Sequence, residues 1–238
     1  MKDSHISINV GIIGGAGYTA GELIRLLLRH PAVNIAFITS NSQAGKPITA
    51  IHSDLIGETD LVFQRDPLEV DVLFLCMGHG KSAIWLADNP PRTDTLVVDL
   101  SRDFRLDEDW VYGLPELNRE KIIGHKRIAN PGCFATAIQL AALPLAASGK
   151  VDASFNVHAI TGSTGAGQNP TTTTHFSWRN NNVSIYKAFR HQHLTEIDRS
   201  IQQVQPFKNI SINFLPLRGK FSRGIFASLY TETELSKT

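Results

Sequence analysis

Short apolar segments alternate with helical patterns along the first half of the chain. Residues 6–13 form a β-branched run that leads into a glycine-rich turn, and residues 19–29 then carry leucine and isoleucine at helical spacing until Pro31. Further strands are predicted at residues 33–39, 71–77 and 95–100, and a further helix at residues 82–87. Continuous apolar strands separated by helices indicate βαβ units, and so predict an α/β fold with a parallel sheet covered on both faces.

The pattern changes in the second half of the chain. A helix is predicted at residues 133–147, and Pro144 inside it should cause a kink or an early end. The polar stretch at residues 161–179 has no periodicity, as is typical of functional or mobile loops. The remaining predicted elements are a strand, a helix and two strands of an antiparallel sheet, at residues 155–160, 193–204, 211–217 and 225–233. We therefore predict two domains, residues 1–150 and 151–238.

Composition and charge narrow the class of protein. The 238 residues are 42% hydrophobic and 19% charged, which is ordinary for a globular protein. Lysine and arginine total 23 against 22 acidic residues, so the basic excess typical of nucleic-acid binders is missing. The N-terminus lacks the apolar core of a signal peptide, no apolar run approaches membrane-spanning length, and two cysteines cannot carry a disulfide scaffold. We expect a cytoplasmic protein with no nucleic-acid or membrane partner.

The turn after the first strand fits a dinucleotide-binding motif. Gly15, Gly17 and Ala20 match G-x-G-x-x-A between a predicted strand and a predicted helix. Glycines at these positions let the backbone approach a pyrophosphate, and the helix start supplies free N–H donors and a partial positive charge. The alternative is a tight turn that binds nothing. The residues expected to contact the cofactor are Gly14, Gly15, Ala16, Gly17, Tyr18 and Thr19.

The end of the second predicted strand favours NADP over NAD. An NAD site normally has an acidic residue there to bind the ribose 2′-hydroxyl. This chain instead has Ser40, Asn41 and Ser42, followed by Lys46. The two serine hydroxyls can hydrogen-bond a 2′-phosphate, and no carboxylate repels it. The alternative is that these residues only build a turn.

Cys133 has the features of a catalytic nucleophile. It follows Asn-Pro-Gly and begins a predicted helix, where unpaired N–H groups and the helix dipole stabilise a thiolate. A thiolate attacks acyl carbons, and the resulting thioester can accept a hydride. The alternative is a small buried hydrophobic residue. Cys76, inside the apolar run VLFLCM, fits that alternative much better.

A histidine-containing segment is the best source of an acid/base group. In His-Gln-His-Leu-Thr-Glu-Ile, either His191 or His193 can exchange protons with the thiol and the acyl oxygen, and Glu196 can orient a histidine or bind substrate. On a helix the two imidazoles point in different directions, so at most one should face Cys133. The alternative for each is a surface or capping histidine. A metal site with Cys133 is not favoured, because third and fourth ligands at suitable spacing are missing.

Taken together, these motifs resemble those of the N-acetyl-γ-glutamyl-phosphate reductases, a family of acyl-phosphate reductases, and the resemblance covers nearly the whole chain. The matching segments are GGAGYTAGEL (14–23), AGK (44–46), DLSRDFR (99–105), YGLPELNR (112–119), NPGCFAT (130–136), TGAG (164–167), HQHLTEI (191–197) and SRGIFASLY (222–230). NPGCFAT and YGLPEL are highly specific in combination. One departure is Thr195, where family members usually have proline.

The resemblance implies a fold and a set of roles. The fold is a Rossmann-type domain joined to an α+β substrate domain of the glyceraldehyde-3-phosphate dehydrogenase type. Cys133 is the nucleophile, and a histidine of the HxHxxEI segment is the acid/base; spacing assigns this role to His191, with His193 as the alternative. Gly165 is expected at the cofactor. Arg223 and Arg105 are expected to bind the carboxylate or phosphate of the substrate. The alternative for each is a surface ion pair, which for Arg105 is equally favoured.

The implied activity is NADPH-dependent reduction of N-acetyl-L-glutamyl 5-phosphate to the 5-semialdehyde and phosphate, through a cysteine thioester, in arginine biosynthesis. The rivals are a related reductase of N-succinyl-glutamyl or aminoadipyl phosphate and a catalytically inactive NADP-binding module. The family also implies a homo-oligomer, a dimer or a tetramer. Proteins of this family continue well past the position of Thr233, so we expect an incomplete second domain with an exposed apolar surface and weak or absent turnover.

Overall fold

The computed structural model describes residues 7–151 and 154–235, which form two compact units, 1–130 and 131–238. The break lies at Asn130–Pro131, well before the predicted boundary near residue 150. The reason is the helix α4 (Cys133–Ala147), which packs against elements of the second unit. A boundary near residue 150 would instead assign α4 to the first unit. No helix in the described part of the chain is long and apolar enough to cross a membrane.

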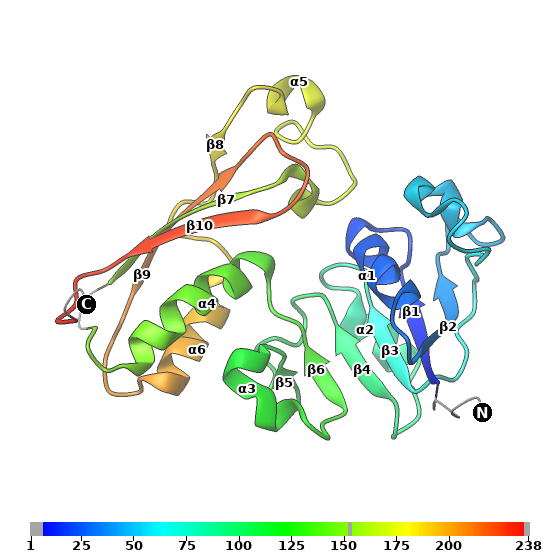
Figure 1. The fold of residues 1–238 in the computed structure, drawn as a ribbon, viewed down its shortest axis with the longest axis horizontal. Helices are drawn as coiled ribbons and strands as arrows, with labels where there is room; N and C mark the ends of the chain where they lie inside the picture. The colour runs from blue at the N-terminus through cyan, green and yellow to red at the C-terminus, as the bar shows by residue number, and fades with distance from the viewer. Residues whose placement is uncertain (1–6, 152–153, 236–238) are drawn as a thin grey trace. The chain divides into compact units, whose positions relative to one another are not determined.

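The first unit is built on a parallel sheet of six strands (Figure 1). In spatial order the strands are β2 (Val33–Thr39), β1 (Ile8–Ile13), β3 (Val72–Leu75), β4 (Leu96–Asp99), β6 (Arg127–Ala129) and β5 (Val111–Tyr112). Every pair of neighbours is parallel, which confirms the predicted sheet. The strand order reverses between β1 and β3, and ligands of such sheets bind at the carboxyl ends of the strands beside that reversal.

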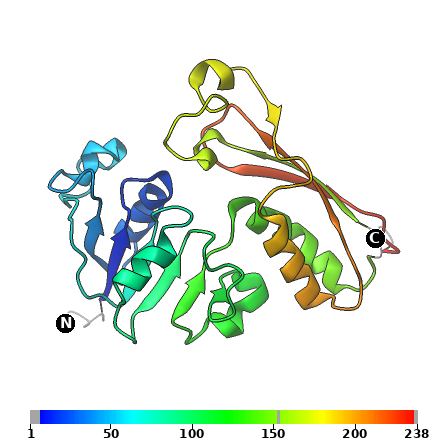
Figure 2. The ribbon, with the colours of Figure 1, turned by 180° about the vertical axis from the view of Figure 1, so that it is seen from behind.

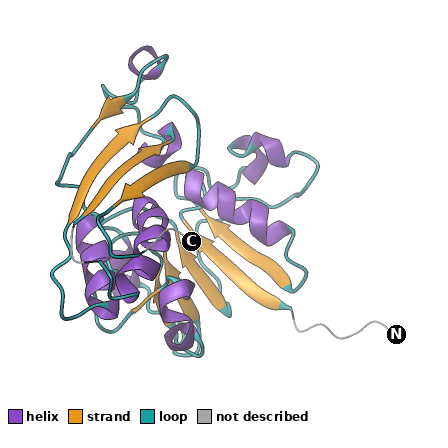
Figure 3. Ribbon diagram, turned by 60° about the vertical axis from the view of Figure 1, so that its left-hand side comes forward, coloured by secondary structure: helices purple, strands orange, loops and turns teal. Residues whose placement is uncertain are grey.

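Helices flank this sheet (Figure 3), and clusters of buried apolar side chains lie on both of its faces. The helices are α1 (Tyr18–Leu28), α2 (Ser82–Asp88) and α3 (Pro115–Ile122). Ile12 packs with Ile24 of α1, whereas the next residue, Ile13, packs with Leu75 and Val97 in a second cluster. Since adjacent strand residues point to opposite faces, both faces of β1 are buried, and this explains its unbroken apolar run.

The second unit contains a mixed sheet of four strands (Figure 1). In spatial order these are β10 (Ile225–Tyr230), β7 (Phe155–Thr161), β9 (Ile212–Arg218) and β8 (Ser184–Ile185). The prediction of an antiparallel sheet is wrong for its central pair, because β7 and β9 run parallel. Parallel neighbours need a crossover connection, which here includes the helix α6 (Leu194–Val204). β10 and β8 pair antiparallel at the two edges.

The helices α4 and α6 lie side by side against one face of this sheet, as Figures 1 and 2 show. Phe134 of α4, Ile197 of α6 and Phe214 of β9 are almost fully buried between these layers. The predicted early end at Pro144 is wrong, since α4 continues to Ala147. The proline cannot bond the carbonyl of Leu140, but Leu140 is an exposed residue whose carbonyl can be hydrated.

The second unit exposes large apolar side chains, as expected. Phe226 and Tyr230 of β10 are 69% and 59% exposed, and Ile185 of β8 is 56% exposed. Register places Phe226 beside Ile160 and Ile185 beside Leu217. Monomeric proteins rarely expose a contiguous apolar patch of this kind without a partner for it.

Candidate active site

The glycine turn of the first unit joins β1 to α1. Gly14 has a positive φ of 83°, and a Cβ there would lie 3.0 Å from backbone atoms of Cys76 and Met77. A Cβ on Gly15 would overlap the side chain of Ile38. These two glycines are therefore required by the packing of the turn against the neighbouring strands, whether or not a ligand binds.

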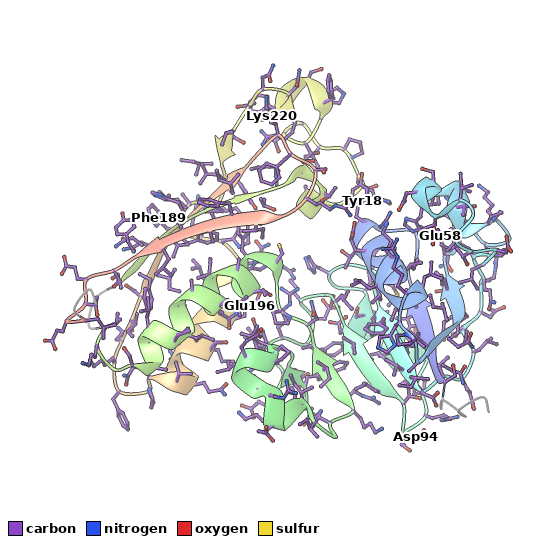
Figure 4. The ribbon with its side chains drawn as sticks, viewed as in Figure 1. Tyr18, Glu58, Asp94, Phe189, Glu196 and Lys220 are labelled. Carbon is purple, nitrogen blue, oxygen red and sulfur yellow. The ribbon has the colours of Figure 1, made fainter. Side chains whose placement is uncertain are left out.

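Gly17 differs from the other glycines of the turn. It is the N-cap of α1, and the nearest atom to a Cβ built there is the Gly14 carbonyl oxygen, 4.0 Å away. Tyr18, labelled in Figure 4, is exposed at the start of the helix, and the first turn of α1 contains no acidic residue. An open helix start with free N–H groups is suited to a phosphate group. The residues of the turn thus fit a dinucleotide, with Gly17 as the position that a pyrophosphate can approach.

His52 secures the turn from outside the motif. Its imidazole is buried, and Nε2 lies 2.9 Å from the carbonyl oxygen of Gly15. A Cβ on Gly21 would come within 2.7 Å of the His52 ring, so Gly21 is the residue that lets this ring approach α1. Sequence reasoning missed His52, because no motif contains it. The only signal was Gly21 itself, a glycine inside a helical pattern without an assigned purpose.

The residues expected at the 2′-phosphate differ in accessibility. Ser40 is buried, and its N–H donates to the carbonyl of Gln64. Ser42 and Lys46 are exposed, and the Lys46 ammonium donates to the Gln43 side chain at 3.1 Å. Ser42 and Lys46 are therefore the residues of this segment that are open to a phosphate group.

The two cysteines lie in contrasting environments. Cys133 is exposed and is the first residue of α4. Cys76 follows β3, and burial, with a smaller contribution from Asp99, raises the pKa of its thiol to about 12. Because only the thiolate is reactive, Cys76 fits a structural role and Cys133 the nucleophilic one.

Both histidines of the HxH segment lie against the first turn of α4. The centroid of the Phe134 ring is 5.3 Å from that of His191 and 6.3 Å from that of His193. The helix α6 begins at Leu194 with His193 as its N-cap, so both histidines precede the helix, and their rings meet edge to face at 4.5 Å. Since Phe134 directly follows Cys133, the structure brings both rings of the segment to the start of the helix that carries Cys133.

His191 is held neutral by its surroundings. His191 is only 4% exposed. Burial, followed by the positive charge of Lys187, lowers the pKa of its imidazole to about 4. The backbone N–H of His193 donates to Nδ1 of His191 at 3.2 Å. With Nδ1 as the acceptor, the ring proton of the neutral form lies on Nε2. The arrangement makes Nε2 a hydrogen-bond donor.

Glu196 links the histidine segment to Gly132, the residue before Cys133. Its Oε2 accepts a hydrogen bond from the N–H of Gly132 at 3.0 Å, and its Oε1 lies 3.9 Å from Nε2 of His193. The side chain is buried beside α4, where Figure 4 labels it. Of the two roles predicted for Glu196, this geometry fits the orienting of a histidine better than contact with a substrate.

The other predicted site residues are divided between the units. In the first unit Arg105 is buried, which does not fit a surface ion pair, and its Nε donates to the carbonyl of Asn130 at 3.0 Å. In the second unit Gly165 lies in a 3₁₀ helix (Ser163–Ala166) next to the segment of Arg223, because the N–H of Thr164 donates to the carbonyl of Ser222. Arg223 is exposed there.

Within the described residues, no cluster of three or more His, Cys, Asp or Glu side chains is suited to a metal ion.

Comparison with known proteins identifies the family. Residues 9–125 match the semialdehyde dehydrogenase NAD-binding domain, and residues 133–238 match the semialdehyde dehydrogenase dimerisation domain. An N-acetyl-gamma-glutamyl-phosphate reductase of Parabacteroides distasonis is 54% identical over 233 residues, covering 96% of this chain and 72% of that protein. Another, of Christiangramia forsetii, is 55% identical over 229 residues, covering 94% and 71%. The chain belongs to the N-acetyl-gamma-glutamyl-phosphate reductase family.

Solved structures agree with the two-part fold of this reductase family. Aspartate semialdehyde dehydrogenase II from Vibrio cholerae, complexed with ASA, has a TM-score of 0.74 at 18% identity, covering 96% of this chain and 75% of that one. Aspartate semialdehyde dehydrogenase with NADP from Candida albicans has a TM-score of 0.68 at 18% identity, covering 98% and 73%. At this identity the likeness concerns the fold alone, and it confirms the expected α/β class with a second domain.

Proposed function

We propose that this member of the family reduces N-acetyl-L-glutamyl 5-phosphate to N-acetyl-L-glutamate 5-semialdehyde and phosphate, with NADPH, as a cytoplasmic enzyme of arginine biosynthesis. The observation that carries the proposal is the exposed Cys133 at the start of α4, where the next residue, Phe134, packs against both buried histidines. The identity of 54% and 55% to two N-acetyl-gamma-glutamyl-phosphate reductases supports this choice of substrate.

The chemistry assigned to Cys133 is covalent. Its thiolate, favoured by the open helix start, attacks the acyl carbon, the carbon–oxygen bond to phosphate breaks, and a thioester forms. NADPH, when bound, supplies the hydride that reduces the thioester carbon. The carbon–sulfur bond then breaks, which releases the aldehyde and restores the thiolate of Cys133.

The role that we propose for His191 is stabilisation of the acyl oxygen. Negative charge develops on this oxygen both when the thiolate attacks and when hydride arrives. A neutral imidazole with its proton on Nε2 can donate a hydrogen bond to that charge. Glu196 positions the segment through Gly132 and His193. His193 remains the alternative to His191.

For the cofactor we propose NADP held by the turn at residues 14–19. The open position at Gly17 suits the pyrophosphate, and Ser42 with Lys46 suits the 2′-phosphate. Ser42→Asp is expected to lower kcat/KM with NADPH by roughly tenfold or more while leaving NADH almost unaffected, because a carboxylate repels the 2′-phosphate. An equal loss with both nucleotides would overturn the assignment.

We also propose a homo-oligomer formed through the outer face of the second sheet. The match to a dimerisation domain supports an oligomer, and Phe226, Tyr230 and Ile185 supply exposed apolar area. Light scattering of purified protein should show a dimer or a tetramer, and Phe226→Asp should shift it toward monomer. An oligomer that resists this change would place the interface elsewhere.

The proposed function is tested in the reverse direction, by phosphate-dependent oxidation of the semialdehyde with NADP⁺. Cys133→Ala should abolish this oxidation while NADPH binding, followed by fluorescence, persists. Comparing kcat/KM for the N-acetyl-glutamate, N-succinyl-glutamate and aminoadipate semialdehydes identifies the acyl group that the enzyme prefers. Preference for the aminoadipyl compound would contradict the proposed substrate, and binding of NADPH without any turnover would indicate the inactive module.

A further inference from the structure

An arginine pair in the second unit is not explained by the chemistry above. Arg179 ends the helix α5 (Phe176–Arg179), and Arg218 ends β9. Nη1 of Arg179 donates to the backbone carbonyl of Arg218 at 2.6 Å, and Nη2 donates to Oγ of Ser184 at 3.0 Å. Arg179 therefore holds the segment that carries Arg218.

Arg218 is connected to the histidines through one aromatic ring. Its guanidinium carbon lies 4.5 Å from the centroid of the Tyr186 ring, and the Tyr186 and His191 ring centroids are 5.8 Å apart. The pKa of the Tyr186 hydroxyl is raised, mainly by burial, and it is influenced by the charges of both Arg218 and Cys133. These contacts place Arg218 in the surroundings of the nucleophile, one ring beyond His191.

Among the described residues, the guanidinium groups of Arg179 and Arg218 have no carboxylate partner. Neither arginine forms a salt bridge with a carboxylate of the described residues, and the Nε atoms of both are buried without a hydrogen-bond partner there. Arg179 is only 5% exposed, and burial followed by the charge of Arg218 lowers the pKa of its guanidinium. Unpaired charge in such surroundings is costly, so a built pair of this kind is expected where an anionic ligand completes it.

We propose that Arg218, positioned by Arg179, binds the α-carboxylate of the acyl-phosphate substrate; this inference rests on the proposed function. A guanidinium matches a planar carboxylate with two parallel hydrogen bonds, and stacking on Tyr186 fixes its plane. Tyr186 thus positions the group that selects the substrate.

The location favours the carboxylate over the phosphate. The phosphate is joined directly to the acyl carbon, so groups that bind it must adjoin Cys133. The α-carboxylate is separated from that carbon by a three-carbon chain. A group one aromatic ring beyond His191 is suited to the more distant anion. The subsite would then select substrates by the length of the acyl chain, because it fixes the distance between the bound carboxylate and the Cys133 thiolate.

The test uses the reverse reaction, with the KM values for semialdehyde and phosphate measured separately. In Arg218→Gln, KM for the semialdehyde should rise roughly 30-fold or more, as expected for a lost charged hydrogen-bond pair, while KM for phosphate stays unchanged. Lys220→Gln is the matched control, because this lysine, labelled in Figure 4, is exposed and its ammonium donates to the Asn181 side chain. It should leave both KM values unchanged.

A second measurement changes the substrate. The semialdehyde whose α-carboxylate is replaced by a carboxamide should be a poor substrate of the unmodified protein, and Arg218→Gln should lose this discrimination. An increase in KM for phosphate alone, or equal use of the acid and the amide by the unmodified protein, would overturn the assignment. Absence of any phosphate-dependent oxidation in the unmodified protein would instead contradict the proposed function.

Discussion

The glycine turn of the first unit and the cysteine site of the second unit are built in different ways. The residues expected to contact the cofactor, Gly14 to Thr19, are contiguous, and residues from elsewhere, such as His52 and Thr39, hold the backbone of the turn. The cysteine site combines the start of α4, the segment before α6 and the end of β9, which are far apart in the sequence. A site made from one segment can be recognised by spacing, whereas a site made from several depends on how the chain folds.

The two regions also differ in what fixes their geometry. In the turn, the side chain of Ile38 and the backbone at the end of β3 leave no room for a Cβ on Gly15 or Gly14. In the cysteine site, the rings of Phe134, His191 and Phe214 contact one another edge to face. Substitutions in the turn should therefore distinguish residues needed for stability from residues needed for cofactor binding. Substitutions in the cysteine site should distinguish the proposed nucleophile, Cys133, from the residues proposed to support it.

The largest expected effect in this comparison concerns the two cysteines. Cys133→Ala should lower kcat at least roughly 10³-fold, because loss of a nucleophile removes the covalent path. Cys76→Ala is the matched control: its thiol is buried, so it should reduce the free energy of unfolding and leave kcat nearly unchanged. Steady-state kinetics and urea unfolding of both variants check this. A similar loss of kcat in both would contradict the separation of roles.

The next effect separates the two histidines. His191→Asn should lower kcat by about 10²- to 10⁴-fold, the usual contribution of a positioned proton-handling group. His193→Asn should cost less, since His193 is expected to help Glu196 position the segment rather than to donate to the acyl oxygen. Both histidines are buried beside Phe134, so circular dichroism serves as the folding control. A larger loss for His193→Asn would transfer the role to His193.

A smaller effect concerns stability against pH. The pKa of His191 is about 4 in the folded protein, below its ordinary value of 6.5, so the unfolded chain binds more protons between these values. The free energy of unfolding should therefore fall as pH falls from 6.5 to 4, by up to about 3 kcal/mol from this group. Urea unfolding across this window should show a shallower decline in His191→Asn. An unchanged slope would show that His191 is not held neutral by burial.

The smallest effect separates packing from binding in the turn. Gly15→Ala should lower the free energy of unfolding by about 1–3 kcal/mol, because its methyl group would overlap Ile38. Gly17→Ala has open space and should leave stability nearly unchanged while weakening NADPH binding. Thermal unfolding and fluorescence titration distinguish the two. Normal NADPH affinity in Gly17→Ala would mean that the pyrophosphate does not approach this position.

Much of the fold could be predicted where periodicity is strong. Val33–Thr39 and Cys133–Ala147 match the predicted bounds, because long apolar segments carry clear patterns. The helix Pro115–Ile122 and the short strands Val111–Tyr112 and Ser184–Ile185 were missed. A strand of only two residues shows no periodicity, and its pairing is decided by the neighbouring strands rather than by its own side chains.

The candidate site divides in the same way. Cys133 and His191 were predicted because each lies in a recognisable motif. Arg179, Arg218 and Tyr186 lie in segments without such motifs, and their contacts form only when β9, β8 and the segment before α6 meet. Single arginines and tyrosines are common, so nothing in the local sequence distinguishes these from surface residues.

The most direct test of the covalent role of Cys133 is mass spectrometry. The protein is incubated with N-acetyl-L-glutamyl 5-phosphate in the absence of NADPH, and the masses of the intact chain and of its peptides are measured. The account predicts one acyl group per chain on the peptide that contains Cys133, absent in Cys133→Ala, and released as semialdehyde when NADPH is added. Oxidation of NADPH by the same preparation without any acyl group on Cys133 would contradict the account.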